Sequence, residues 1–273
     1  MRTKSYSLLI LYAWLILFCA CPLLLVGITS MLSKSNLDVA SLPLTLDNYR
    51  ALFTPAFVKI LWRSLGMAFT ATLGCLIIAY PFSYVMVTSK HASRFLLFII
   101  IPFWTSSLIR TYALLAILKY KGLLNALLLK YHLIATPLSL LYSNFAVLLG
   151  LIYNLLPFMI LPIFTNMERF DFRLIEAAKD LGASKLIIFF RVFLPNTLSG
   201  IATGSLLVML PAMTLFYIPN VLGGARSVLL GNLIQNQFLV LNDWPGGAAT
   251  SMLLTVMLLL SLSVLRRFKE RNI

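Results

Sequence analysis

The stretch from Glu176 to Pro195 reads EAAKDLGASKLIIFFRVFLP and lies between two long apolar runs. It carries charge in a sequence that otherwise avoids it. Acid at Glu176 precedes base at Lys179 and Lys185, an order that complements the helix dipole. Gly182 is expected to end a first helix, because a positive φ is common at that position. The stretch therefore predicts a helix, a tight turn and a second helix.

Other residues complete this expected protrusion. Ser184 is placed to cap the second helix, and Pro195 is expected to break or redirect the chain before the next apolar run. Ala177 and Ala178 are strong helix formers with little side-chain bulk, so a partner surface could approach them closely. The pattern indicates a docking surface for a soluble partner.

The composition places the chain among membrane proteins. Of its 273 residues, 60% are hydrophobic and 11% are charged, whereas a soluble domain carries about a quarter charged residues. The net charge of +14 fits basic residues at span ends and in cytoplasmic loops. Nucleic acid is not expected as a partner, because no basic stripe with interleaved aromatics occurs. Cys19, Cys21 and Cys75 lie in apolar runs without the spacing of a metal site.

Six segments are long and apolar enough to span a bilayer, which takes about 20 residues. They cover about residues 8–31, 64–88, 95–118, 138–164, 199–217 and 247–265. The first run is too long for a signal-peptide core, so it is expected to be retained as a span. Residues 48–64 and 121–132 are expected to form amphipathic helices on the bilayer surface, or short helices on the outer ends of the bundle.

The distribution of basic residues predicts the orientation. Thirteen of the 22 Lys and Arg residues lie in the termini and in the loops on their side, so both termini are expected in the cytoplasm. The prediction is an all-α polytopic membrane protein with six transmembrane helices. One permease-like domain would cover residues 1–273, with a cytoplasmic loop over about 168–195.

The charged stretch resembles a motif of a known family. Glu-Ala-Ala, a Gly four residues after the second Ala, and a later Leu-Pro match the EAA loop in permease subunits of ATP-binding-cassette importers, with Val192 in place of Ile. The resemblance implies a type I (MetI-like) importer architecture and a coupling helix that inserts into a groove on a cytoplasmic ATPase. The residues that it assigns to this coupling are Glu176, Ala177, Ala178, Gly182, Ala183, Leu194 and Pro195.

The resemblance covers nearly the whole chain. PFWTSSLIR at 102–110, LVMLPAM at 207–213 and DWP at 243–245 are similar to the PotB-type permeases of bacterial spermidine/putrescine importers. This implies a polyamine cargo and a bacterial inner-membrane location. The implied partners are a PotC-type second permease, two copies of a PotA-type ATPase and a PotD-type binding protein. ATP and magnesium would belong to the ATPase, and no cofactor is expected in this chain. It also lacks a Gly-Lys-Ser/Thr phosphate loop, so it is not expected to be an enzyme.

No acidic residue lies in a predicted span. A polyamine would therefore meet aromatic faces, hydroxyls and carbonyls, or carboxylates of the other permease; cation–π contacts are worth about 0.5–2 kcal/mol each. The candidates for the substrate path are Trp104, Ser107, Tyr112, Thr214, Tyr217 and Asn220. The candidates for the outer mouth are Tyr49, Asp243 and Trp244. For each aromatic, packing in the bundle is the competing interpretation.

Two expectations concern the surroundings of these candidates. Ser107, Thr111 and Tyr112 are expected to share one helical face, and Pro211 and Pro219 favour a broken helix. Arg110 is expected to snorkel to the outer surface, with pairing to a partner carboxylate or rejection of cations as alternatives.

Other functions remain open at this point. The closest alternative is an importer of another small solute, such as sulfate, phosphate or iron. A self-sufficient secondary transporter would favour ionisable residues in the spans and an internal repeat. An intramembrane enzyme would need facing catalytic groups, yet His91 and His132 lie in loops.

Overall fold

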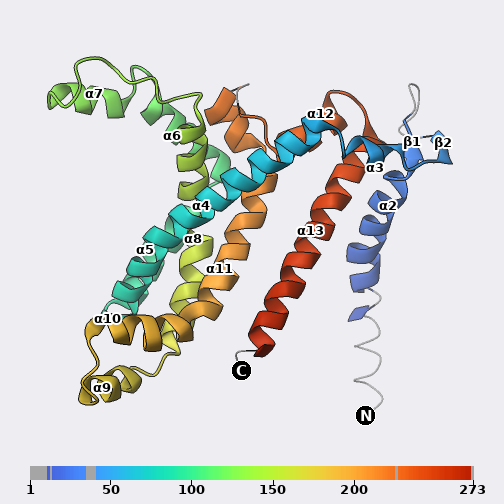
Figure 1. Ribbon diagram of the computed structural model, residues 1–273. Coiled ribbons are helices and arrows are strands. Elements are labelled where there is room, and N and C mark those ends of the chain that lie inside the picture. The colour runs from blue at the N-terminus through green and yellow to red at the C-terminus, as the bar shows by residue number, and fades with distance from the viewer. Residues whose placement is uncertain (1–10, 13, 35–40, 225–226, 272–273) are drawn as a thin grey trace, which may run out of the picture. The chain divides into compact units, whose positions relative to one another are not determined.

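In the part of the chain that the structure describes, nearly all elements are helices, with one short β-hairpin (Figure 1). The computed structural model describes residues 11–12, 14–34, 41–224 and 227–271. Five helical segments in this part of the chain are long and apolar enough to cross a membrane: Pro55–Thr88, Ser107–Lys130, Asn144–Glu168, Lys185–Thr214 and Trp244–Ser263. Contacts divide the chain into two units, Met1–Leu61 with Leu233–Leu260, and Trp62–Asn232 with Ser261–Ile273.

The first unit contains the hairpin, which the expectation of an all-helical chain did not include. A π-helical turn, η1 (Ile16–Ala20), leads into α2 (Cys21–Thr29), and the strands β1 (Leu32–Ser33) and β2 (Ser41–Leu44) pair antiparallel. The helix α3 (Asp47–Ala51) follows. Residues 8–10 and 13 of the predicted first span lie outside the described residues. The segment Ile16–Thr29 is apolar but shorter than a full span.

The second unit is organised around α8 (Asn144–Glu168), which packs against α11 (Leu194–Thr214), α6 (Ser107–Leu118) and α5 (Ala92–Phe103). Ser143 caps α8, because its hydroxyl accepts a hydrogen bond from the Ala146 amide at 3.1 Å. Residues 138–143 of the predicted fourth span are therefore not helical. Side chains at steps of four along α8 are buried, which places them on one face: Val147, Leu151, Leu155, Met159, Ile163 and Met167.

Two glycines let α8 and α11 approach closely. A Cβ on Gly200 would lie 2.7 Å from Asn166 Cβ, and a Cβ on Gly204 would lie 2.8 Å from Met159 Sδ. The two glycines are four residues apart and so lie on the same face of α11. Small residues at this spacing are common at helix interfaces in membranes, where close packing replaces the hydrophobic effect as the driving force.

The long helix α4 (Pro55–Thr88) differs from the sequence prediction. Residues 55–63, expected in a separate surface helix, continue without interruption into the predicted second span at 64. The other expected amphipathic helix is present as α7 (Leu123–Lys130). Asn125 holds it in place: its amide donates to the Leu138 carbonyl at 2.9 Å, and its Oδ1 accepts from the Leu138 amide at 2.9 Å.

The predicted third span, 95–118, is two helices rather than one. α5 ends at Phe103, and α6 begins at Ser107. Pro102 has no amide to donate, and the hydroxyl of Thr105 donates to the Pro102 carbonyl at 2.6 Å. Ser106 then takes an extended conformation with ψ of 131°. Together these features end α5 and begin a new helix after three residues.

Of the two outcomes expected at Pro195, a break or a change of direction, the break is not found. The helical segment runs from Lys185 to Thr214, as α10 (Lys185–Ile188), the π-helical turn η2 (Phe189–Phe193) and α11. The Leu194 amide donates to the Phe189 carbonyl, five residues back. This wider turn accommodates the proline ring, which in a regular helix would clash with the carbonyl four residues earlier.

The remaining elements complete the order. α9 (Arg173–Asp180) precedes α10, the π-helical turn η3 (Pro219–Gly223) follows α11, and α12 (Leu230–Leu239) comes next. α13 (Trp244–Arg271) begins three residues before the predicted sixth span and extends past its end. In the second unit, α9 and α7 lie at opposite ends of the long helices (Figure 1).

Candidate functional site

The predicted helix, turn and helix are present at Arg173–Ile188. Gly182 has φ of +78°. Its amide donates to the Lys179 carbonyl at 2.8 Å, and the Ala183 amide donates to the Ala178 carbonyl at 3.0 Å. This is the hydrogen-bond pattern of a Schellman motif, which satisfies the free carbonyls at a helix end. The predicted role of Gly182 as the residue ending the helix is confirmed.

Ser184 begins the second helix as predicted, because its hydroxyl accepts a hydrogen bond from the Ile187 amide at 3.5 Å. The tip between the two helices exposes apolar side chains: Leu181 is 88% exposed and Leu186 is 71% exposed. Glu176 and Ala177 are also exposed, whereas Ala178 and Ala183 are half-buried. We call Arg173–Ile188 the helical protrusion.

An aromatic cluster anchors the base of the helical protrusion. Phe193 is buried and lies 5.2 Å from the ring of Phe170 and 5.4 Å from that of Tyr84. Tyr80 packs edge-on against Phe193 at 6.2 Å, and its hydroxyl lies 3.0 Å from Thr197 Oγ1. The cluster therefore connects the base of the helical protrusion to α4 and α11. The sequence prediction missed this cluster, although FF-x-x-F at 189–193 is its visible signal.

Two helix breaks meet in the second unit. One lies between α5 and α6, and the other follows α11, where Leu215 takes an extended conformation with ψ of 105°. The hydroxyl of Tyr217 donates to Ser107 Oγ at 2.9 Å. Two predicted path residues are thus brought together, and the expected break near Pro211 and Pro219 is found at residues 215–216. We call residues 104–107 with 214–220 the paired helix breaks.

Asn232 holds the second break in place. Its side-chain amide donates to the Phe216 carbonyl at 2.9 Å and to Asn220 Oδ1 at 2.6 Å. One carbonyl released by the break is therefore satisfied by a side chain from α12. Asn220 was predicted for the substrate path and is exposed. Asn232 was not predicted, although a buried amide in an apolar segment is itself a signal of structural or functional need.

The remaining path candidates are less closely grouped. Trp104 lies in the first break and is 86% exposed. Thr214 is exposed at the end of α11, and its hydroxyl contacts the carbonyls of its own helix. Thr111 is fully buried and accepts from the Asn154 side chain at 3.3 Å, whereas Tyr112 is exposed. The expected shared face of Thr111 and Tyr112 is wrong, because consecutive helical residues are turned about 100° apart.

Arg110 is buried, and its guanidinium carbon lies 5.8 Å from the ring centre of Phe103 and 6.0 Å from that of Tyr153. The expected snorkelling toward the outer surface is not what the structure shows. Side chains on a helix lean toward its N-terminus, and Arg110 accordingly reaches back to Phe103 rather than toward Leu118.

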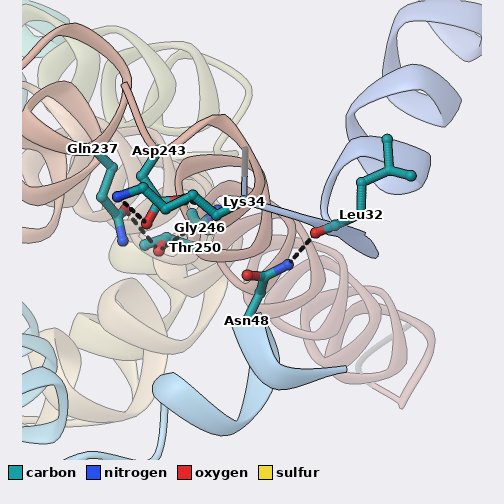
Figure 2. Close-up of polar contacts among 7 residues, drawn as sticks. All are labelled: Leu32, Lys34, Asn48, Gln237, Asp243, Gly246 and Thr250. Atoms are coloured by element: carbon teal, nitrogen blue, oxygen red, sulfur yellow. Dashed lines mark hydrogen bonds and ion pairs between the residues drawn. The ribbon is translucent and has the colours of Figure 1, made fainter. Parts of the chain in front are cut away.

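The three outer-mouth candidates make contacts within the first unit, and Figure 2 shows those of Asp243. Asp243 Oδ1 accepts from the Gly246 amide at 3.1 Å, which caps α13, and Asp243 Oδ2 lies 3.9 Å from Lys34 Nζ. Trp244 packs edge-on against Phe238 at 5.5 Å, and the Tyr49 hydroxyl lies 2.7 Å from Ser30 Oγ. Asp243 therefore caps α13, a role that was not predicted from the sequence.

The same unit is tied together near the hairpin. The side-chain amide of Asn48 donates to the Leu32 carbonyl at 2.8 Å and to the Ser30 carbonyl at 2.9 Å. Thr250 on α13 donates to Gln237 on α12 at 3.0 Å. The first two bonds join α3 to the end of α2 and to β1, and the third joins α13 to α12 (Figure 2).

The protrusion and the helix breaks can be compared with known proteins. The chain is 43% identical over 268 residues to the spermidine/putrescine transport system permease protein PotB of Haemophilus influenzae, covering 97% of this chain and 94% of that protein. It is 46% identical over 253 residues to PotB of Escherichia coli, covering 92% of each. A stretch of 49 residues, 18% of the chain, is 41% identical to the permease PotC of Escherichia coli. No family model matches the chain.

Solved structures show the same fold. A bacterial alginate ABC transporter, solved in complex with a periplasmic protein bound to an alginate pentasaccharide, aligns with a TM-score of 0.78 at 14% identity and covers 99% of this chain and 94% of that one. The MetNI methionine ABC transporter aligns with a TM-score of 0.57 at 16% identity, covering 81% of this chain and all of that one. The chain is an all-α membrane protein of the importer-permease fold and belongs to the PotB family of non-catalytic, multi-pass inner-membrane permease subunits of spermidine/putrescine ABC importers.

Proposed function

We propose that this chain forms half of the translocation path of an ATP-driven polyamine importer and passes ATPase closure to that path through the helical protrusion. The observation that carries the proposal is an exposed apolar tip on a rigidly capped turn. Exposure of the apolar side chains of Leu181 and Leu186 to water is unfavourable, so binding of a protein surface that covers them is favoured. The cargo is inferred from the PotB relatives, whose names state spermidine and putrescine.

The topology that we propose has six spans with both termini in the cytoplasm. Four of these spans would be α4, α8, α10 with α11, and α13. The other two would be α5 together with α6, and the apolar N-terminal segment that includes Ile16–Thr29. The helical protrusion and α7 lie at opposite ends of the second unit (Figure 1). With the termini inside, the protrusion would face the cytoplasm, where a PotA-type ATPase dimer would bind ATP and magnesium.

For the substrate, we propose a path beside the paired helix breaks. Helix breaks expose backbone carbonyls, and in membrane proteins such irregular backbone occurs where it lines a cavity or is buried in protein. Trp104, Tyr217 and Phe216 add aromatic faces, which hold an ammonium weakly enough to release it. The second half of the path would come from a PotC-type permease, and a PotD-type protein would deliver cargo near Tyr49, Asp243 and Trp244.

The same importer class with another small solute is the competing function. The test is ATP-dependent uptake of radiolabelled spermidine by proteoliposomes that contain this chain with its neighbouring transporter subunits. Spermidine uptake that unlabelled putrescine inhibits and sulfate does not would support the polyamine assignment. ATP hydrolysis by an assembled complex without any polyamine uptake would refute it.

The path is tested in the same vesicles with Trp104→Ala, and Trp62→Ala serves as the matched control because Trp62 is also exposed. We expect the Trp104 variant to lose most uptake while the complex still assembles and hydrolyses ATP. Equal uptake by both variants would remove Trp104 from the path.

A further inference from the structure

Arg110 has no ion-pair partner among the residues that the structure describes. It is 8% exposed, and its Nε is buried without a hydrogen-bond acceptor in the described part of the chain. Arginine does not give up its proton in proteins, so the guanidinium remains charged. The rings of Phe103 and Tyr153 lie within 6.0 Å, but cation–π contacts are weak beside the cost of burying an unpaired charge.

The acidic residues whose side chains the structure describes do not supply the missing partner. Those whose side chains the structure describes lie at helix ends or in connecting segments, and none of their ion pairs involves Arg110. They are Asp47, Glu168, Asp171, Glu176, Asp180 and Asp243. Within the described residues, a second copy of the chain would therefore bring no carboxylate from the middle of a span either.

The surface beside Arg110 favours a partner protein that covers apolar side chains and also satisfies the guanidinium. Ile109, the preceding residue, is 65% exposed, and Tyr112 and Phe103 are also exposed. Lipid chains would cover these apolar side chains but would leave the guanidinium unsatisfied. Lipid phosphates lie at the bilayer surface, whereas Arg110 leans away from the Leu118 end of α6 and toward the break at residues 104–106.

We propose that Arg110 forms a buried ion pair with an aspartate or glutamate in a span of the second permease, and that this pair fixes the register between the two permeases beside the paired helix breaks. The proposal rests on the proposed function, because it requires the second permease. A planar guanidinium donates two parallel hydrogen bonds to a carboxylate, which sets orientation as well as affinity. The pair also neutralises a cation that would otherwise repel a polyamine at the breaks.

The test is a charge-swap experiment on the full complex, purified through a tag on this chain. Arg110→Asp is expected to lower the amount of co-purified second permease at least about tenfold, since breaking a buried pair leaves a lone charge. Lys119→Asp, on the exposed end of the same helix, is the matched control and is expected to change nothing. Reversing one acidic span residue of the second permease to lysine is expected to restore assembly with Arg110→Asp.

A second measurement covers the case in which Arg110→Asp does not fold. A photo-crosslinking p-benzoylphenylalanine replaces the exposed Ile109 in the otherwise unchanged complex, and the crosslinked peptides are identified by mass spectrometry. A span peptide of the second permease that contains Asp or Glu is expected. Crosslinks to phospholipid alone, unchanged assembly of Arg110→Asp, or failure of every charge reversal to restore assembly would each overturn the proposal. If the unaltered chain does not co-purify the second permease, the proposed function fails as well.

Discussion

The hydroxyl of Tyr217 donates a hydrogen bond to Ser107 Oγ at 2.9 Å, across 110 residues of sequence. Each residue lies next to a helix break. Ser107 is the first residue of α6, and Tyr217 comes just after the end of α11. Both were predicted as substrate-path residues from their chemistry. Their contact was not predictable, because it depends on how α6 and α11 pack against α8.

A double-mutant cycle measures this contact. Tyr217→Phe and Ser107→Ala are each expected to lower the free energy of unfolding by about 0.5–1.5 kcal/mol, the usual net value of one hydrogen bond. Together they are expected to cost no more than the larger single change, because both remove the same bond. SDS-induced unfolding in micelles provides the measurement. Fully additive effects would show that the two hydroxyls act independently.

Gly182 provides a test of the turn in the helical protrusion. Its φ is +78°, and a Cβ there would meet no atom within 4 Å. Gly182→Ala is therefore expected to act only through backbone strain of about 1–2 kcal/mol. We expect it to weaken co-purification of the ATPase, whereas Gly182→Asn should retain most of it, because asparagine tolerates this conformation. Equal binding by both variants would show that the turn geometry is not needed.

The α8–α11 contact can be tested by adding one methyl group. Gly200→Ala places a Cβ 2.7 Å from Asn166 Cβ and 3.0 Å from the Pro162 carbonyl oxygen, whereas Gly66→Ala meets nothing within 4 Å. Both changes improve helix propensity equally, so their difference isolates the clash. We expect Gly200→Ala to be less stable than Gly66→Ala by about 1–3 kcal/mol, measured by SDS-induced unfolding. Identical curves would contradict the close approach.

Two substitutions of Asp243 distinguish a structural role of this residue from a role in cargo delivery. Asp243→Ala removes the cap of α13 and is expected to cost about 0.5–2 kcal/mol. Asp243→Asn can still accept from the Gly246 amide, and the lost pairing with half-exposed Lys34 is worth only about 0–1 kcal/mol. If Asp243 is mainly a cap, Asp243→Asn is expected to keep normal spermidine uptake. Loss of uptake without loss of stability would instead assign the carboxylate to the binding protein or the cargo.

Local chemistry in the sequence predicted much of the helical protrusion. Gly182 and Ser184 act through their own neighbours, and six apolar runs follow from composition alone. The sequence prediction failed where a distant or subtle backbone feature intervenes. The π-helical turn that accommodates Pro195 was not predicted. Hydropathy treats the run around Pro102 as continuous, although the proline itself weakens the helix there.

The environment of a polar side chain was also beyond the sequence prediction. Arg110 was expected to reach the outer surface, but the direction of side chains on α6 and the rings of Phe103 and Tyr153 keep it buried. Asp243 was expected at the outer mouth, and its two oxygens are already engaged by Gly246 and Lys34. The burial of Arg110 and the pairing of Asp243 with Lys34 depend on tertiary contacts, whereas the cap at Gly246 is local and typical of aspartate.

The most direct test of the central claim measures ATP hydrolysis and spermidine uptake side by side in proteoliposomes that contain Leu181→Asp. Leu181 is 88% exposed at the tip of the helical protrusion, and Leu133→Asp is the matched control because Leu133 is 69% exposed in the loop after α7. We expect Leu181→Asp to lose at least about 90% of uptake through loss of the ATPase contact, since a charge replaces an apolar anchor, while Leu133→Asp transports normally. Unchanged uptake by Leu181→Asp, with the ATPase still bound, would contradict the proposal that this tip couples ATP hydrolysis to transport.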